Sequence, residues 1–379
     1  MQKVIEIVKG YYKLQSDEKD FHRNIYIRKF PIKNEGLGLL FNRFKRKQSI
    51  NMIMDPGTKL DLPRLEDTLK ELIGGLKNLD IIFVSHQDPD VSSNVLPLLM
   101  RAKNSVLIGS IDSWRLIKMY GVPRGRFKAA ESFISSYFEI PGTNSKIYFV
   151  PASYCHFRGA MMVYDPDTRV LFTGDFMAGL NTMNKQSVYA DESAWPGIAL
   201  FHQIYMPSKK ALRTTIDLIR MLTPKVEIIA PQHGYVIKGE LVDEFLERLY
   251  HLDVGVDIED VNNVYTGRLV LALSEFLNKV RVYNIIVHTK LLKLMKESQT
   301  RDFTQPLVFM GDEVAKINVG YEQAVEYIVS LIRRHFKKEE EELLILLNDA
   351  LVGLSLPIPQ FMASILTEEM RKEVFKEVQ

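Results

Sequence analysis

Four apolar, strand-like runs in this chain each end in residues that can bind a metal ion. The first run, residues 80–84, leads into His86, Asp88 and Asp90. Side chains at positions i, i+2 and i+4 just beyond a buried strand can converge on one small site. The three later runs end at His156, Asp175 and His233. Ordinary caps and turns do not require four apolar strands to end in this way, so the pattern predicts a fold that brings these strand ends together.

The six candidate ligands combine three imidazoles with three carboxylates and include no thiolate. Nitrogen and carboxylate oxygen donors suit iron or manganese, and they also tolerate zinc. One carboxylate that bridged two cations would let the set hold a binuclear site. A lone strand-end aspartate is more often a helix cap or turn residue, and a lone histidine is more often a hydrogen-bonded loop residue. The prediction of a metal site therefore depends on the joint occurrence of all six.

Composition limits the class of protein. The 379 residues are 46% apolar and carry a formal net charge of +2, enough chain for one large domain and a smaller one. The near-neutral charge argues against a nucleic-acid-binding protein driven by bulk charge. Cys155 is the only cysteine, so neither an intrachain disulfide nor a cysteine-based metal cluster can form. Its apolar neighbours favour a small buried residue over a redox thiol.

Neither end of the chain contains a targeting or membrane-spanning pattern. Residues 1–12 lack the apolar core of a signal peptide. The longest apolar stretch near the C-terminus, residues 343–358, is interrupted by Asn348 and Asp349 and is too short to span a bilayer. We therefore expect a soluble cytoplasmic protein that does not associate with membranes.

The pattern of residues predicts two regions. Eight β-leaning runs are expected at residues 24–30, 49–54, 81–84, 105–108, 146–150, 161–164, 170–172 and 226–230. Helical periodicity among them is found at residues 62–74, 91–102 and 208–222. This mixture indicates an α/β domain over residues 1–240. Residues 241–379 are expected to be mainly helical, with periodicity at residues 240–252, 268–281, 285–297, 321–336 and 339–354.

On these motifs the chain resembles the metallo-β-lactamase superfamily, and within it the flavodiiron proteins and their oxygen-binding diiron relatives. Zinc hydrolases of the superfamily carry His-x-His-x-Asp-His on the first loop. Here Asp88 stands in place of the second histidine, which is similar to the His-x-Glu-x-Asp pattern of the diiron branch with a shorter acid. The spacing of the later ligands and the segments 205–207 and 230–234 are also similar. The resemblance covers residues 20–240 and implies an αββα sandwich there; the mainly helical C-terminal extension is expected from periodicity alone.

The resemblance also implies how the ligands divide between two irons. His86, Asp88 and His156 would bind one iron, Asp90 and His233 the other, and Asp175 would bridge them. Flavodiiron proteins usually place a histidine directly after the first motif, where this chain has Val91, so the second iron would have fewer nitrogen donors. His202 could compensate, although a core or supporting histidine is favoured. Candidates for residues that support the ligands are Tyr154, Thr173, Met177, Tyr205 and Gln232, although ordinary packing is favoured for any one of them.

The implied function is that of a non-haem diiron protein that binds dioxygen as a sensor or carrier. Reduction of O2 or NO with an external electron donor is the first alternative, and in that case the chain would be a diiron oxidoreductase. Residues 240–379 lack a Ser/Thr-rich phosphate loop after a strand, so we expect no flavin bound by this chain alone. A redox or signalling partner and a homo-oligomer are also expected.

Two other classes compete with this interpretation. A binuclear metal hydrolase would activate water at the same site to cleave a phosphodiester, thioester or lactam; manganese or zinc in place of iron also stays possible for the site. Asp88 argues against it, because hydrolases of this fold mostly keep the histidine. A silent interaction module that retains only the fold is disfavoured by the retention of all six ligands.

Overall fold

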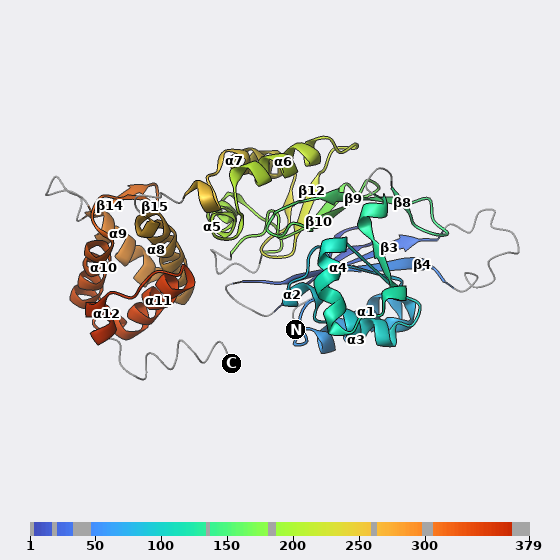
Figure 1. Cartoon of the computed structure of the whole chain (residues 1–379), viewed down its shortest axis with the longest axis horizontal. Helices are drawn as coiled ribbons and strands as arrows, with labels where there is room; N and C mark the ends of the chain where they lie inside the picture. The colour runs from blue at the N-terminus through green and yellow to red at the C-terminus, as the bar shows by residue number, and fades with distance from the viewer. Residues whose placement is uncertain are drawn as a thin grey trace, which may run out of the picture. The chain divides into compact units, whose positions relative to one another are not determined.

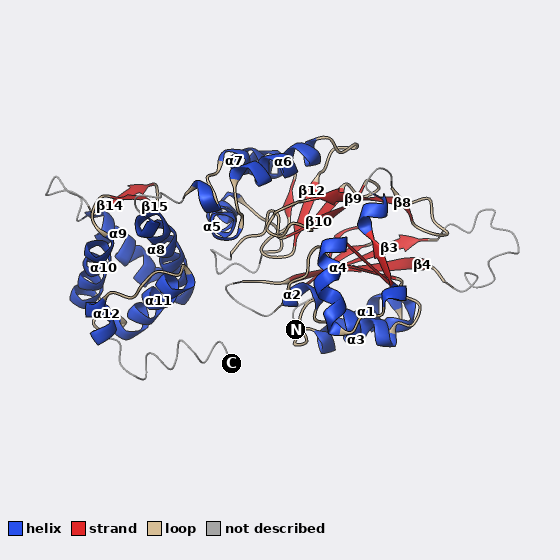
Figure 2. Ribbon diagram, viewed as in Figure 1, coloured by secondary structure: helices blue, strands red, loops and turns tan. Residues whose placement is uncertain are grey.

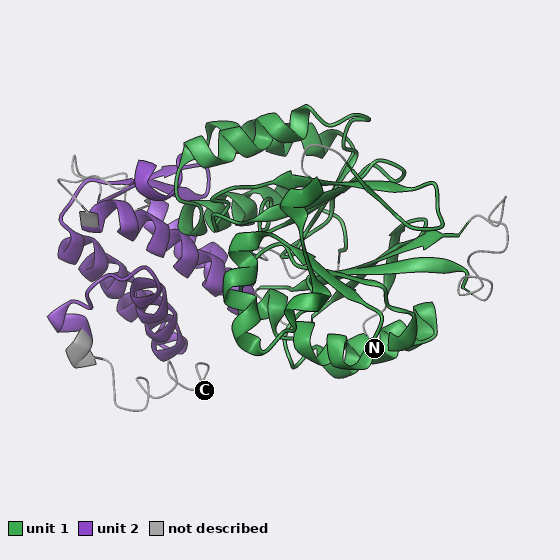
Figure 3. Cartoon of the chain, turned by 45° about the vertical axis from the view of Figure 1, so that its right-hand side comes forward, with its two compact units in different colours: residues 1–181, 186–252 green, residues 182–185, 253–379 purple. Residues whose placement is uncertain are grey.

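The computed structural model describes residues 4–16, 21–32, 47–133, 137–180, 187–258, 264–297 and 306–365. The chain divides into two compact units (Figure 3). Unit 1 comprises residues 1–181 and 186–252, and unit 2 comprises residues 182–185 and 253–379. The domain limits expected from the sequence stay a prediction, and each unit is described by itself.

Unit 1 contains a mixed seven-stranded sheet whose strands follow the order of the sequence; its neighbouring strands β3 and β4 are labelled in Figure 1. Its strands are β1 (Ile5–Val8), β2 (Tyr11–Gln15), β3 (Asn24–Pro31), β4 (Ser49–Met54), β5 (Ile81–Phe83), β6 (Val106–Gly109) and β7 (Phe127–Ala129). Neighbours from β1 to β4 are antiparallel, whereas β4 to β7 run parallel. The parallel strands β4 and β5 therefore end at the same edge of the sheet.

The second sheet of unit 1 has six strands in the order β13-β12-β11-β10-β9-β8. They are β8 (Phe138–Glu139), β9 (Lys146–Pro151), β10 (Met161–Asp165), β11 (Val170–Gly174), β12 (Ile228–Pro231) and β13 (Ile237–Lys238). Only the β11–β12 pair is parallel among these neighbours. As a result, the loops after β11 and β12 leave the sheet on the same side.

The two sheets pack face to face, and helices cover their outer faces (Figure 2). Alternation along the strands explains this, because Tyr26 and Phe83 join the core between the sheets while Ile27 and Ile82 join the core beneath the helices. The helices of unit 1 are α1 (Leu62–Ile73), α2 (Pro89–Ser92), α3 (Val95–Arg101), α4 (Ile111–Ile117), α5 (Trp195–Tyr205), α6 (Lys209–Arg220) and α7 (Glu240–His251). The predicted αββα sandwich is confirmed.

The helical periodicity at residues 91–102 corresponds to two helices instead of one. The segment divides into α2 and α3, which are separated at Ser93 and Asn94. The Asn94 side chain is fully buried and donates a hydrogen bond to the carbonyl of Pro56, 2.9 Å away. This contact ties the start of α3 to the loop after β4, an interaction between segments that local periodicity does not reveal.

Unit 2 is mainly helical, as expected. Its helices are α8 (Val264–Tyr283), α9 (Ile285–Glu297), α10 (Tyr321–His335), α11 (Glu340–Gly353) and α12 (Gln360–Ile365). The helices enclose one apolar core that includes Phe276, Ile328 and Leu347. A hairpin of β14 (Leu307–Met310) and β15 (Glu313–Ile317), which the sequence did not predict, is added to this unit. In the described part of the chain, none of the helices combines the length and apolar character needed to cross a bilayer.

Candidate metal centre

All six predicted ligands lie in unit 1 on the segments that follow β5, β9, β11 and β12, and their side chains meet at one edge of the sandwich. Parallel pairing of β4 with β5, and of β11 with β12, sends the loops to the same edge. His86 and His233 are buried, whereas Asp88 and Asp90 are about one-third exposed at their side chains. The cluster is therefore enclosed on the protein side and open at the two acids of the first motif.

One group of donors consists of His86, Asp88 and His156. Its three ligand atoms lie within 4.8 Å of one another, as in a possible metal site. The Nε2 atom of His156 is 3.3 Å from Oδ2 of Asp88, and Nε2 of His86 is 3.5 Å from the same oxygen. Two imidazoles and one carboxylate thus face a common point.

A second group consists of Asp90 and His233, whose Oδ2 and Nε2 atoms are 3.2 Å apart. Asp175 lies between the two groups. Its Oδ2 atom is 3.0 Å from Nε2 of His156 and 3.5 Å from Nε2 of His86. Its other oxygen, Oδ1, is 3.6 Å from Nε2 of His233. One carboxylate oxygen therefore faces each group, which is the arrangement that a bridging ligand needs.

The opposite charges in the cluster shift the pKa values of its histidines and of Asp175. Burial alone would lower the pKa of His86, but Asp175, Asp88 and Asp55 outweigh it and raise that pKa to about 9. For His156, burial is likewise outweighed by Asp175 and Asp88, and its pKa rises to about 10. Burial opposes ionisation of Asp175, yet the surrounding imidazoles lower its pKa to about 2. Protons therefore compete with any cation here, and cation binding weakens as pH falls.

The donor set fits a pair of cations. The Oδ1 atom of Asp175 is buried and accepts no hydrogen bond from the described residues, an arrangement that costs free energy unless a cation or donor occupies the space. The Nδ1–H group of His233 donates to the carbonyl of His22 at 3.0 Å, which leaves the Nε2 lone pair directed at Asp90 and Asp175. Three carboxylates and three imidazoles suit iron, manganese or zinc.

A hydrogen-bond chain that the sequence interpretation missed supports His86. Asp55, at the end of β4, accepts from the Ser85 backbone N–H at 2.7 Å and from the Ser85 hydroxyl at 2.5 Å. Because that hydroxyl donates to Asp55, its oxygen accepts from Nδ1 of His86, 2.8 Å away, and Nε2 is left free to bind a metal. Burial raises the pKa of Asp55 to about 7. The signal in the sequence is an acid directly after a predicted strand, residues 49–54, which is also typical of a turn.

Replacing Asp55 with asparagine is expected to weaken metal binding about 10- to 100-fold, because the amide cannot accept both Ser85 donors and His86 loses its orientation. Isothermal titration of the metal-free chain with Co²⁺ measures this change. Asp67→Asn, an exposed acid on α1, is the matched control and should bind Co²⁺ like the parent chain. Unchanged affinity in Asp55→Asn would show that the hydrogen-bond chain does not support the ligand.

The predicted supporting residues differ in their placement. Gln232 contacts a candidate ligand directly, since its Nε2 donates to Oδ2 of Asp90 at 3.0 Å. The ring of Tyr205 lies 6.3 Å from that of His156. Thr173 and Met177 are buried on either side of Asp175 in the sequence, whereas Tyr154 is 53% exposed. Gln232 and Tyr205 are thus the members of this set with described contacts to the cluster.

Three other residues that the sequence singled out serve the core. His202 is fully buried, and its Nδ1 bonds to the Ile198 carbonyl while its Nε2 accepts from the Met177 N–H at 3.0 Å. Both nitrogens are thereby used, and His202 is a supporting histidine rather than a ligand. Val91 belongs to the core beneath the helices. Cys155 is buried, and burial raises the pKa of its thiol to about 12.

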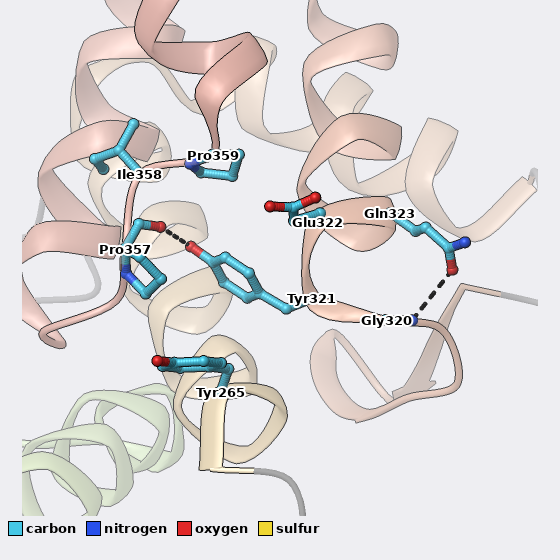
Figure 4. A pocket seen from close by; sticks show the side chains of 8 residues that line it. All are labelled: Tyr265, Gly320, Tyr321, Glu322, Gln323, Pro357, Ile358 and Pro359. Carbon is cyan, nitrogen blue, oxygen red and sulfur yellow. Dashed lines mark hydrogen bonds between the residues drawn. The ribbon is translucent and has the colours of Figure 1, made fainter.

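Two cavities lie away from the candidate ligands. One, of about 370 Å³ in unit 2, is lined by Tyr265, Tyr321 and the Pro357–Pro359 segment, and the Tyr321 hydroxyl donates to the Pro357 carbonyl across it (Figure 4). The other, of about 860 Å³ in unit 1, is lined by charged residues that include Arg28 and Glu227. Neither cavity is lined by any of the six candidate ligands.

Comparison with known proteins gives a consistent result. The model of a family described as "ODP family beta lactamase" matches residues 42–234. The apo state of the chemotaxis sensor ODP from T. denticola is 25% identical, with a TM-score of 0.51, over 65% of this chain and 97% of that one. A structure of the peroxy diiron species of the chemotaxis sensor ODP is 24% identical, with a TM-score of 0.51, over 68% and 97%.

More distant similarity extends to flavoproteins. The flavodiiron protein from Giardia intestinalis is 12% identical, with a TM-score of 0.56, over 74% of this chain and 68% of that one. The protein named "Putative diflavin flavoprotein A 1" of Thermosynechococcus vestitus is 22% identical over 244 residues, which is 60% of this chain. The chain spans 38% of the length of that curated relative.

Proposed function

The chain belongs to the ODP beta-lactamase family, and from this premise we propose that it is a non-haem diiron protein that binds dioxygen as a sensor or carrier. One observation carries the proposal: the two oxygens of Asp175 face two separate groups of donors. His86, Asp88 and His156 would hold one iron and Asp90 and His233 the other. When bound, a pair of ferrous ions supplies the two electrons that reversible dioxygen binding draws on.

The residues of the chain would orient the ligands and limit access of water. The hydrogen-bond chain from Asp55 through Ser85 sets the orientation of His86. Phe21 stacks on the ring of His233 with centroids 3.8 Å apart, and Phe201 stacks on Phe21 at 5.8 Å. These apolar rings cover one face of His233 and keep water from that side of the ligand.

The comparisons support this choice over the alternatives. The chemotaxis sensor ODP, 24–25% identical to this chain, forms a peroxy diiron species and spans little beyond the matched region. Asp88 in place of a histidine disfavours a zinc hydrolase. Reduction of O2 or NO with an external donor uses the same ligands, so kinetics must separate it from sensing.

Anaerobic purification, metal analysis and a visible spectrum before and after exposure to air test the proposal. We expect about two irons per chain and a new oxygen-dependent charge-transfer band. Two zinc ions with phosphodiesterase turnover would overturn it. Glu71→Gln, an exposed change on α1, is the control and should give the parent spectrum.

Stopped-flow measurement in the presence of excess artificial electron donor separates a sensor from a reductase. In a sensor or carrier, the oxygen-dependent band is expected to persist while donor remains. Rapid loss of the band, accompanied by continuous oxygen consumption, would identify a reductase instead.

A further inference from the structure

The short segment that carries Gln232 and His233 is held by hydrogen bonds from the opposite sheet. The side-chain amide of Asn24 donates to the carbonyls of Pro231 at 3.0 Å and Gly234 at 2.9 Å. The Asn24 backbone N–H donates to the Gln232 carbonyl at 2.6 Å. The Tyr26 hydroxyl donates to the Pro231 carbonyl at 3.0 Å, and Nζ of Lys13 donates to the Gly234 carbonyl at 3.3 Å. Three side chains of β2 and β3 thus form hydrogen bonds to both ends of the segment, Pro231 and Gly234.

Lys13 is an unusual residue for this place. It is 1% exposed, and its described hydrogen bond is the one to the Gly234 carbonyl. Lysine is almost never fully buried without a charged partner, because desolvating an ammonium group is costly. Burial lowers the pKa of Lys13 to about 7. Because burying the Lys13 amine costs free energy and its hydrogen bond goes to the Gly234 carbonyl, we infer that Lys13 does more than fill space in the core.

The segment has little freedom to settle elsewhere. Gly234 has φ +82°, and a Cβ atom at this position would lie 2.9 Å from the Gly179 carbonyl oxygen. The Gly179 N–H donates in turn to the His233 carbonyl at 3.3 Å. The segment is therefore confined between β2 and β3 on one side and the loop after β11 on the other.

The same part of the chain also sets the direction of the His233 ring. His22 accepts from Nδ1 of His233, and Phe21 stacks on the ring. The ring thereby directs Nε2 at Asp90, 3.2 Å away, and at Oδ1 of Asp175. We propose that Lys13 and Asn24 are positioning residues for the second metal position, the one formed by Asp90 and His233; this inference rests on the proposed function.

Lys13 and Asn24, together with the Tyr26 hydroxyl, form a clamp of hydrogen bonds on residues 231–234. The two metal positions should respond differently to changes in this clamp. His86 is oriented by Ser85 and Asp55, and His156 lies on the loop after β9, so neither depends on residues 231–234. Loss of the clamp should therefore weaken the second position much more than the first, which is linked to residues 231–234 through Asp175 and its neighbour Gly174. A general loss of stability would instead weaken both positions together.

Titration of the metal-free full chain with Co²⁺, followed by its visible spectrum, tests the proposal. The parent chain is expected to bind two Co²⁺ ions. In Lys13→Met and Asn24→Ala, the second position should weaken at least about tenfold while the first stays within about twofold. The spectrum of each variant with one ion bound should match that of Asp90→Asn, which lacks a second-position ligand. Lys29→Met, also on β3 but bonded to the Leu72 carbonyl, should behave like the parent chain.

The outcomes separate the two proposals. A parent chain that binds fewer than two Co²⁺ ions would overturn the diiron site itself. Parallel weakening of both positions, or retention of both, in the variants of a two-ion parent would overturn the clamp alone. Tyr26→Phe removes only the hydroxyl that donates to Pro231 and is expected to weaken the second position several-fold. This mild change keeps the test valid if the larger substitutions prevent folding.

Discussion

Replacing Asp175 with alanine is expected to lower the metal content from about two ions to fewer than about one per chain. The two carboxylate oxygens lie 3.0 Å from Nε2 of His156 and 3.6 Å from Nε2 of His233, so both donor groups lose a ligand. The imidazoles also lose the buried anion that favours a cation between them. This is the largest effect on metal binding that we expect from one substitution.

Metal analysis after anaerobic purification measures the effect, and two further variants define it. Asp90→Ala should keep about one ion, because it removes a ligand from the second position only. Asp167→Ala, an exposed acid in the turn before β11, should retain the full metal content. Full occupancy in Asp175→Ala would contradict a bridging role for this carboxylate.

Replacing Asp165 with alanine is expected to reduce the free energy of unfolding by about 3–5 kcal/mol. Asp165 ends β10 and pairs with Arg28 of β3, with Nε and Oδ2 2.7 Å apart and side chains only 6% and 3% exposed. Arg28 also donates to the Lys29 carbonyl at 2.7 Å, so its guanidinium is held in place after its partner is removed. The substitution therefore leaves a buried positive charge without its carboxylate partner.

Urea unfolding followed by tryptophan fluorescence measures this loss in unit 1, because both tryptophans, Trp114 and Trp195, belong to that unit. The double variant Arg28→Met/Asp165→Leu should recover most of the stability, since replacing both partners of a buried ion pair is often neutral. If Asp165→Ala lowers the free energy of unfolding by less than about 1 kcal/mol, the pair contributes no more than an ordinary surface ion pair, which would contradict the prediction.

Apolar runs predicted strands that are buried throughout, such as β10 and β11, and helical periodicity predicted helices with one buried face, such as α6. The prediction failed where tertiary contacts alter these patterns. The strand β2 was not predicted because a lysine, Lys13, occupies one of its buried positions and interrupts the apolar pattern. The helix α5 was missed because it is buried on most sides, from Gly197 to His202, and shows little periodicity. The short edge strands β7, β8 and β13 contain too few residues to show alternation.

The sequence by itself determined which groups could bind a metal and that each follows a buried strand, because residue identity and apolar runs are local properties. Only the tertiary structure decided that Asp175 presents one oxygen to each group of donors. It alone also brought Asp55 beside Ser85, and Lys13 and Asn24 beside Gly234. These contacts depend on strand order and on the packing of two sheets, since hydrogen bonds join side chains that are distant in the sequence only after both sheets have formed.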